Sequence, residues 1–401
     1  MYDLYKLYTC TCSVRRERER ESLDLRDSIP SLSDFFASHV RVLVTLCERE
    51  REFESTMGDG SIRAAQTRVE VLRNWFVVET GGRGGDKRGR SANEDMYEDV
   101  NGINVRRNVL LAIRERKIGV VALETSIVCH GLPFPENLHL AKRLEEIVRE
   151  SGCEPAHVAV IRGVPTVGLG DEELEMLAKL GKRVPKCSTR DLGYLAATQK
   201  HGGTTVSGTL SIIEHVPGMH VFATGGIGGV HRGGETSMDV SADLVALGRA
   251  TQTAVVCAGA KSLLDIPRTL EVLETQGVCV ATLGSDKFPA FFVRDSGIAS
   301  PRSFDSIDDA AKATVAPLAR GLLLCVPPEE TEASRAAQEA LEEALTHVAK
   351  VRGSDVTPFV LGRTHERSGG KSVEANTALV KANVRVASQL AATIADNASR
   401  R

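Results

Sequence analysis

From about Asn104 onward, the chain alternates short apolar stretches with amphipathic ones. In the first amphipathic stretch, Leu140 and Leu144 recur at helical spacing before Gly152, and residues 171–181 follow the same pattern. Six apolar stretches, mostly rich in valine and bounded by glycine or proline, predict β-strands at 120–123, 157–161, 220–224, 253–259, 278–284 and 321–327. Strands alternating with helices predict an α/β/α layered fold with a largely parallel central sheet.

The first hundred residues have a different texture. Arginine and glutamate alternate from Val14 and again from Glu48, and a stretch rich in glycine and arginine begins at Glu79. Such charge-dense segments bury too little apolar surface to fold alone. We therefore predict a charged, partly disordered extension at residues 1–100, with one helix near 62–78, and a folded domain at 101–401.

Composition narrows the classes of function. A net charge of −3 and 4% aromatic residues give no case for a nucleic-acid partner. The apolar runs are too short to cross a membrane, and no secretory signal is evident. Nine cysteines without a CxxC pair indicate reduced thiols in an intracellular compartment. We expect the cytoplasm by default, with an organelle such as the peroxisome left open.

Three polar segments follow predicted strands directly. Glu124 follows 120–123, a glycine-rich loop at 224–234 follows the strand at 220–224, and Lys261 follows 253–259. Because the carboxyl ends of parallel strands line one crevice, we expect these segments to meet there.

Lys261 and Glu124 carry the sharpest hypotheses. Desolvation among the apolar neighbours of Lys261 would lower the pKa of its amine and free it to attack a carbon centre, although an ordinary lysine at a helix start fits as well. Apolar neighbours of Glu124 would raise the pKa of its carboxyl and make it a general acid. The alternative is a carboxylate that caps a turn or pairs with an arginine.

The glycine-rich loop has six glycines in eleven residues. Its main-chain N–H groups could surround a phosphate or a sugar, whereas tight turns without a ligand are the alternative. His231 in this loop is either a hydrogen-bond partner for a heterocycle or a structural side chain.

Two aspartates and a second lysine complete the set of candidates. Asp239 and Asp243 stand four residues apart and would share one face of a helix, where they suit Mg²⁺ or Mn²⁺ or serve only as helix-dipole partners. Lys186 precedes a Ser-Thr pair that could start a helix, and it fits either a phosphate contact or an exposed surface position.

Several motifs together resemble the pseudouridine-5'-phosphate glycosidase family, also known as indigoidine synthase A. They include ALETSIVCHGLPFPEN, VPKCSTRDL, FATGGIGGVHRGGETSMDVSADL and VVCAGAKSLLD, and the resemblance runs in order from about Asn104 to Ala395. The resemblance implies a homotrimeric enzyme that uses a divalent ion, typically Mn²⁺. It also implies reversible cleavage of pseudouridine 5'-phosphate by water to uracil and ribose 5-phosphate.

The resemblance also assigns roles to residues. Lys261 is implied as the covalent nucleophile, Glu124 as the proton donor and Asp239 as the metal ligand. The implied substrate contacts are Lys186, Val206, Ser241, Ala242 and Asp243, with Thr224, His231 and Asn376 as additional pocket residues.

One departure and two alternatives accompany this hypothesis. The family usually reads ALEST where this chain reads ALETS, so Thr125 and Ser126 keep both hydroxyls in exchanged order, which we expect to affect packing more than chemistry. An imine-forming lyase on another phosphosugar would use the same lysine. A catalytically inactive sugar-phosphate sensor would keep only the pocket.

Overall fold

A computed structural model describes residues 96–347 and 356–400. Residues 1–95 of the predicted extension, with the helix near 62–78, lie outside the described residues. The sheet begins at Tyr97, within the range 1–100 that was predicted as the extension. The strands are β1 (Tyr97–Val100), β2 (Ile103–Arg106), β3 (Val120–Glu124), β4 (Glu154–Ile161), β5 (Val164–Val167), β6 (Lys186–Cys187), β7 (Gly202–Thr204), β8 (Val221–Ala223), β9 (Ala254–Cys257), β10 (Cys279–Leu283), β11 (Arg302–Phe304) and β12 (Leu322–Cys325).

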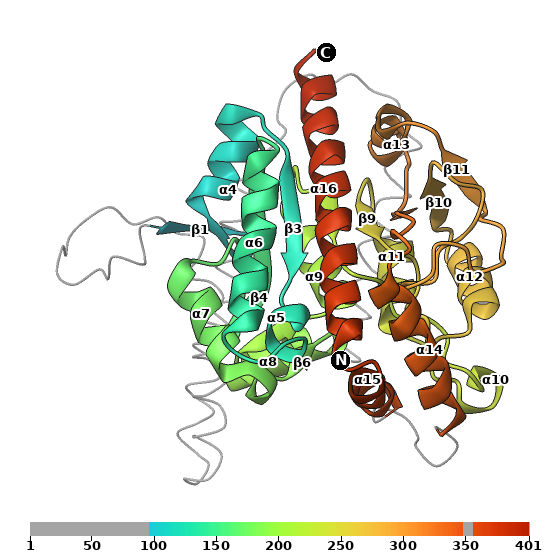
Figure 1. Cartoon of the computed structure of the whole chain (residues 1–401). Helices are drawn as coiled ribbons and strands as arrows, with labels where there is room; N and C mark the ends of the chain where they lie inside the picture. The colour runs from blue at the N-terminus through green and yellow to red at the C-terminus, as the bar shows by residue number, and fades with distance from the viewer. Residues whose placement is uncertain (1–95, 348–355, 401) are drawn as a thin grey trace, which may run out of the picture. The chain divides into compact units, whose positions relative to one another are not determined.

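Helices connect these strands (Figure 1). The α-helices are α4 (Arg107–Leu111), α5 (Ser126–His130), α6 (Glu136–Glu150), α7 (Asp171–Leu180), α8 (Leu192–Thr198), α9 (Val206–Ile213), α10 (Gly234–Ser237), α11 (Ala242–Arg249), α12 (Ile266–Thr275), α13 (Ile307–Thr314), α14 (Glu332–Thr346), α15 (Val356–Arg367) and α16 (Lys371–Ser399). Short π- and 3₁₀-helical turns are η2 (Ala112–Arg116), η3 (Gly181–Arg183) and η4 (Thr189–Asp191).

The strands form one sheet in the order β1-β2-β5-β4-β3-β8-β9-β12-β10-β11, with β7 paired to β4 and β6. Every neighbouring pair from β4 to β11 along this order is parallel. The pairs β1–β2, β4–β5 and β4–β7 are antiparallel. All six predicted strands are present. The strands that were not predicted are short or lack a continuous apolar run.

Side chains that alternate along the strands divide the core into two faces. Val121 and Leu123 of β3 belong to one core cluster with residues of α6, α13 and α16, whereas Val120 and Ala122 belong to another with residues of α9, α11 and α12. The long helix α16 lies beside α6 across the first of these faces (Figure 1). The predicted α/β/α layering and largely parallel sheet are therefore confirmed.

The predicted single helix through Asp239 and Asp243 is wrong. Helix α10 ends at Ser237, and Met238 adopts a left-handed conformation with φ of 55°. Helix α11 then begins after Ser241, whose hydroxyl accepts a hydrogen bond from the Asp243 main-chain nitrogen. The hydroxyl side chain offered a new helix start, and this separates the two carboxylates.

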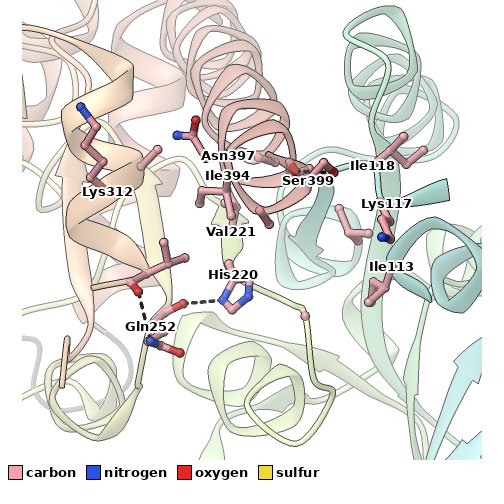
Figure 2. A pocket seen from close by; sticks show the side chains of 18 residues that line it. Ile113, Lys117, Ile118, His220, Val221, Gln252, Lys312, Ile394, Asn397 and Ser399 are labelled. Atoms are coloured by element: carbon pink, nitrogen blue, oxygen red, sulfur yellow. Dashed lines mark hydrogen bonds between the residues drawn. The ribbon is translucent and has the colours of Figure 1, made fainter. Parts of the chain in front are cut away.

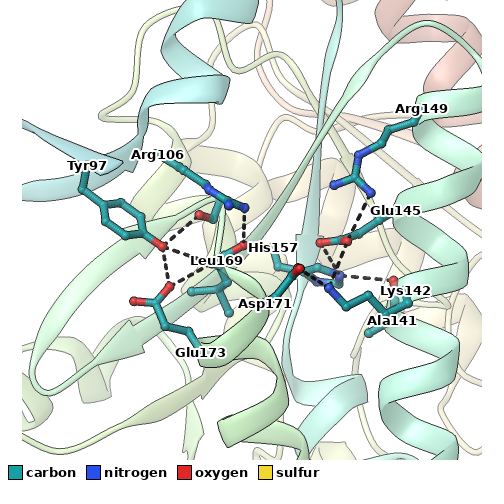
Figure 3. Close-up of polar contacts among 12 residues, drawn as sticks. Tyr97, Arg106, Ala141, Lys142, Glu145, Arg149, His157, Leu169, Asp171 and Glu173 are labelled. Atoms are coloured by element: carbon teal, nitrogen blue, oxygen red, sulfur yellow. Dashed lines mark hydrogen bonds and ion pairs between the residues drawn. The ribbon is translucent and has the colours of Figure 1, made fainter. Parts of the chain in front are cut away.

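Polar contacts at the β4 side of the sheet fasten strands to helices (Figure 3). The Tyr97 hydroxyl donates to Glu173 of α7 and accepts from the Gly170 main-chain nitrogen at 3.1 Å. Buried His157 of β4 has Nε2 3.9 Å from a Glu145 carboxylate oxygen on α6. Desolvation lowers the pKa of His157, which favours a neutral ring in a structural role.

Two further predictions concern the described residues. All six described cysteines, at positions 129, 153, 187, 257, 279 and 325, are free thiols, as expected. No helix within 96–347 or 356–400 is both long and apolar enough to span a bilayer.

Candidate active site

The site lies where three adjacent parallel strands end. Strands β3, β8 and β9 are neighbours in the sheet. Glu124 is the last residue of β3, Thr224 directly follows β8, and Lys261 follows β9 after a short turn. The predicted convergence of the three polar segments at one edge is therefore confirmed.

Main-chain hydrogen bonds join the glycine-rich loop to the turn that carries Lys261. Ala258 donates to the Gly225 oxygen at 2.9 Å, and Ile227 donates to the Gly259 oxygen at 3.1 Å. The Lys261 nitrogen in turn donates to the Ile227 oxygen at 3.1 Å. The pairing of β8 with β9 thus continues beyond both strands and fixes the backbone of Lys261 beside the loop.

Glu124 sits in surroundings that suit a general acid. Thr224 and Ser126 hydroxyls each donate to one of its carboxylate oxygens. The residue is partly exposed, but protein atoms crowd the carboxyl group, and this desolvation raises its pKa. The positive charge of Lys261 and the two hydroxyl hydrogen bonds oppose that increase. Within the described ranges Glu124 pairs with hydroxyl groups rather than with an arginine.

Lys261 is itself partly buried, between neighbours that are almost wholly buried. Its charge lies close enough to shift the pKa of both Glu124 and Lys186. The amine, the carboxylic acid and the second lysine therefore share one electrostatic environment. The desolvation of the Lys261 amine that the flanking sequence suggested stays a prediction.

Lys186 lies close enough to Lys261, Glu124 and Asp243 for their charges to shift its pKa. The residue is exposed, yet local desolvation and the nearby charge of Lys261 lower the pKa of its amine. The predicted helix start after it is confirmed, because the Ser188 hydroxyl and the Asp191 carboxylate cap η4, which leads into α8. The substrate contact of Lys186 stays a prediction.

Asp243 holds two parts of the site together. Its side chain is 6% exposed. One carboxylate oxygen accepts from the Ser207 main-chain nitrogen at 2.9 Å, and the other accepts from that of Gly228 at 2.9 Å. Asp243 thereby joins the start of α9, where Val206 lies, to the glycine-rich loop. Its predicted contact with substrate stays a prediction.

Close packing accounts for glycine at two positions of the loop. A Cβ atom on Gly228 would lie 2.4 Å from the Ser241 hydroxyl oxygen, and one on Gly226 would lie 2.6 Å from a ring carbon of Phe291. No side chain fits at either distance. Tight packing, which was the alternative to ligand binding, therefore explains these two glycines without a phosphate.

The other predicted pocket residues border the same loop. The main-chain nitrogen of Ser241 donates to the Gly229 oxygen at 3.0 Å, and Ala242 is the exposed first residue of α11. The Asn376 amide oxygen lies 3.5 Å from the position of a Cβ on Gly225. The substrate contacts of these residues stay predictions.

The predicted metal ligand, Asp239, is partly exposed and lies between helices α10 and α11. The Asp239 main-chain oxygen accepts from the His231 nitrogen at 3.0 Å. In the part of the chain that the structure describes, no three His, Cys, Asp or Glu side chains gather to hold an ion. Because Asp243 is already satisfied, Asp239 offers a single carboxylate rather than a cage.

Sequence reasoning missed Asn383, and it expected a packing role for Thr125 without identifying its hydrogen bonds. Buried Asn383 of α16 donates to the main-chain oxygens of Thr224 at 2.8 Å and Gly225 at 3.1 Å. The Thr125 hydroxyl, fully buried, donates to the Val158 oxygen at 2.7 Å and accepts from the Thr204 nitrogen at 3.0 Å. Asn383 has no local sequence signal, because its partners lie more than 150 residues away.

Comparison with known proteins places this fold and site in a family. The family model described as indigoidine synthase A like protein matches residues 108–393. A crystal structure of a prealnumycin C-glycosynthase in complex with ribulose 5-phosphate superimposes with a TM-score of 0.68 and 34% identity, covering 76% of this chain and all of that one. An indigoidine synthase A-like protein from Thermotoga maritima gives a TM-score of 0.63 and 33% identity, covering 70% and 94%.

Curated relatives agree with this assignment. A pseudouridine-5'-phosphate glycosidase of Arabidopsis thaliana is 48% identical over 69% of this chain and 85% of its own length. One from Solibacter usitatus is 47% identical over 68% and 93%. The chain belongs to the indigoidine synthase A like protein family, together with these pseudouridine-5'-phosphate glycosidases.

Proposed function

We propose that the protein is a pseudouridine-5'-phosphate glycosidase, which splits pseudouridine 5'-phosphate and water reversibly into uracil and ribose 5-phosphate. One observation carries the proposal: Glu124, with its pKa raised by desolvation, and Lys261 share one site at the ends of β3 and β9. A nucleophilic amine and a general acid are the two groups that this reaction requires. Relatives at 47–48% identity carry that activity in their names.

The bond to be broken explains why an amine is needed. Pseudouridine joins C1' of ribose to C5 of uracil, so no glycosidic nitrogen can be protonated as a leaving group. In the proposed path, neutral Lys261 Nζ bonds to C1' as the C1'–O4' bond breaks, and O4' takes a proton. The bonded nitrogen next returns a proton to the Glu124 carboxylate and regains its lone pair. This lone pair forms an iminium as the C1'–C5 bond breaks, and the electron pair of that bond stays on C5.

Proton transfers complete the path. Glu124 donates the proton that O4' takes and, after it is recharged, the proton that C5 takes. Water then adds to the iminium and releases ribose 5-phosphate together with the free amine of Lys261. Atoms and charge balance for one water consumed.

A divalent ion, Mn²⁺ or Mg²⁺, belongs to the same proposal. A single carboxylate at Asp239 fits an ion that keeps much of its water and takes its remaining ligand from the substrate phosphate. Such an ion would offset phosphate charge beside Lys186. We expect Mn²⁺ binding, followed by electron paramagnetic resonance, to need ribose 5-phosphate and to weaken in Asp239→Asn. Assembly as a homotrimer stays a prediction, which sedimentation equilibrium tests.

The main test is release of uracil. Pseudouridine 5'-phosphate is incubated with the protein and Mn²⁺, and free uracil is measured by chromatography. We expect uracil from the wild type and none from Lys261→Ala. Borohydride with ribose 5-phosphate should add covalent mass to the wild type and to Lys200→Ala, an exposed lysine control, but not to Lys261→Ala. Folded protein that releases no uracil would refute the proposal.

An imine-forming lyase on another pentose phosphate is the second candidate. The structural neighbour that was crystallised with ribulose 5-phosphate favours it, because that protein is a C-glycosynthase. Borohydride trapping without uracil release would support this candidate. If the protein shows neither borohydride trapping nor uracil release, the interpretation that remains is a catalytically inactive sugar-phosphate sensor.

A further inference from the structure

The amino end of the sheet holds a cavity of about 530 Å³ (Figure 2). It lies at the opposite ends of β3 and β8 from Glu124 and Thr224. Its apolar walls include Val120, at the start of β3, Val221, at the start of β8, and Ile394 of α16. This volume, with mainly apolar walls and a few polar groups, is typical of sites for small molecules.

His220 lines the cavity and presents a defined acceptor. Its Nδ1 lies 2.8 Å from the main-chain oxygen of Gln252 (Figure 2). Because a carbonyl oxygen only accepts, we assign the hydrogen of the neutral ring to Nδ1. The remaining ring nitrogen, Nε2, is then an acceptor, and the bond to Gln252 fixes the orientation of the ring.

Gln252 supplies a second acceptor. Its side-chain nitrogen donates to the main-chain oxygens of Val315 and Ala316, each at 3.2 Å, which leaves Oε1 as its uncommitted atom. Its backbone is left-handed, with φ of 49°, and its nitrogen donates to the Ala319 oxygen at 3.1 Å. Such strain in a residue other than glycine persists where surrounding contacts enforce it, often at ligand sites.

A cationic group completes the polar lining. Two lysines line the cavity. Lys312 is paired with Asp308 at 2.5 Å, whereas none of the ion pairs among residues 96–347 and 356–400 includes Lys117. The cavity therefore combines two fixed acceptors with one available ammonium donor.

We propose that this cavity is a second ligand site, which takes a small planar lactam or imide heterocycle. The N–H groups of such a ring would donate to His220 Nε2 and Gln252 Oε1, a ring carbonyl would accept from Lys117, and the ring faces would lie against the apolar walls. Uracil belongs to this class. The choice of uracil as ligand rests on the proposed function, because uracil is the product of that reaction.

The test reads the ring of His220 directly. Nitrogen-15 NMR of the histidine rings, assigned with His220→Phe, is recorded while uracil is added. We expect a saturable shift of the His220 Nε2 signal, and no comparable shift with 1,3-dimethyluracil, which has no N–H donor. By calorimetry, His220→Phe should weaken binding at this site about tenfold, the usual effect of one lost hydrogen bond. His215→Phe, an exposed histidine outside the cavity, should bind uracil as the wild type does.

Two results would overturn the proposal. One is a His220 signal that does not move at saturating uracil, and the other is an equal shift with 1,3-dimethyluracil. Neither measurement needs turnover. A negative result here leaves uracil release from pseudouridine 5'-phosphate untouched, and a protein that releases no uracil can still show the NMR shift.

Discussion

The two segments that meet at the active site are built in contrasting ways. In the glycine-rich loop, Gly225 and Ile227 are hydrogen-bonded to the turn that carries Lys261. The segment that carries Asp239 is an exposed turn after the four-residue helix α10, and Met238 in it is 80% exposed. The proposed nucleophile thus stands on a backbone fixed by the sheet, whereas the proposed metal ligand stands on a turn with exposed neighbours. Changes in the first segment should affect both rate and stability, and changes in the second should affect ligand binding alone.

The largest expected effect is that of Glu124→Gln on the rate. Glutamine keeps the shape of the glutamate side chain and can still accept a hydrogen bond from Thr224 or Ser126, but it cannot donate an acidic proton. We expect kcat for uracil release to fall about 10²- to 10⁴-fold, with a smaller change in KM. Because the pKa of Glu124 is raised, wild-type activity should decline on the alkaline side as the carboxyl group loses its proton.

The matched control for this prediction is Ser126→Ala. It removes one hydroxyl donor to Glu124 and keeps the acid. Its alkaline limb should move to higher pH, since a hydrogen bond that favours the carboxylate is lost. A glutamine variant with wild-type kcat would exclude Glu124 as the acid.

The two aspartates provide the most direct comparison of the segments. In Asp243→Asn the new amide group can accept only one of the N–H donors of Ser207 and Gly228, so we expect a loss of about 1–3 kcal/mol in the free energy of unfolding. Asp239→Asn should change that free energy by less than about 0.5 kcal/mol and weaken Mn²⁺ binding instead. Urea denaturation measures both variants. Equal losses of stability would show that the segments do not differ in the way described.

A smaller effect is expected at Thr125, which directly follows β3 and whose buried hydroxyl bonds to β4 and β7. Thr125→Val keeps the shape but leaves the Thr204 nitrogen without its acceptor, at a cost of about 1–2 kcal/mol. Thr125→Ser keeps the hydroxyl and should cost less than about 1 kcal/mol. Urea denaturation distinguishes the two variants. Similar losses would indicate that the methyl group, rather than the hydroxyl, stabilises this position.

The positions of the Thr125 and Ser126 hydroxyls explain why this chain can carry threonine and serine in exchanged order relative to the family motif. The hydroxyl at 125 points into the core and the hydroxyl at 126 reaches Glu124, so both hydrogen bonds remain available in either order. The double exchange Thr125→Ser with Ser126→Thr should therefore keep kcat within about threefold of the wild type. This corresponds to a change of less than about 0.7 kcal/mol in the activation free energy. Steady-state rates of uracil release test this expectation.

The sequence predicted the part of the site that depends on periodicity. Valine-rich strands identify β3, β8 and β9, and the position of a residue after a strand identifies Glu124 and Lys261. The break at Met238 could not be predicted in the same way, because the capping hydroxyl of Ser241 competes with continuation of the helix and tertiary contacts decide the outcome. Asn383 was missed because its partners are distant in sequence. Local patterns thus identify which residues lie at the sheet edge, and long-range packing decides which contacts hold them in position.

The smallest expected effect is the pH dependence of stability conferred by Glu124. Its carboxyl has a raised pKa in the folded state, so over the interval between the ordinary carboxyl pKa, about 4.3, and the raised value, the folded protein holds a proton that the unfolded chain has lost. The contribution of Glu124 to stability therefore falls as pH rises through that interval and is constant on either side of it. Glu124→Gln has no such titration, so its free energy of unfolding relative to the wild type should rise across the interval and then level off. Urea denaturation at a series of pH values measures this difference. If the difference instead shrinks with rising pH, the folded site prefers the charged carboxylate of Glu124, stabilised by Lys261.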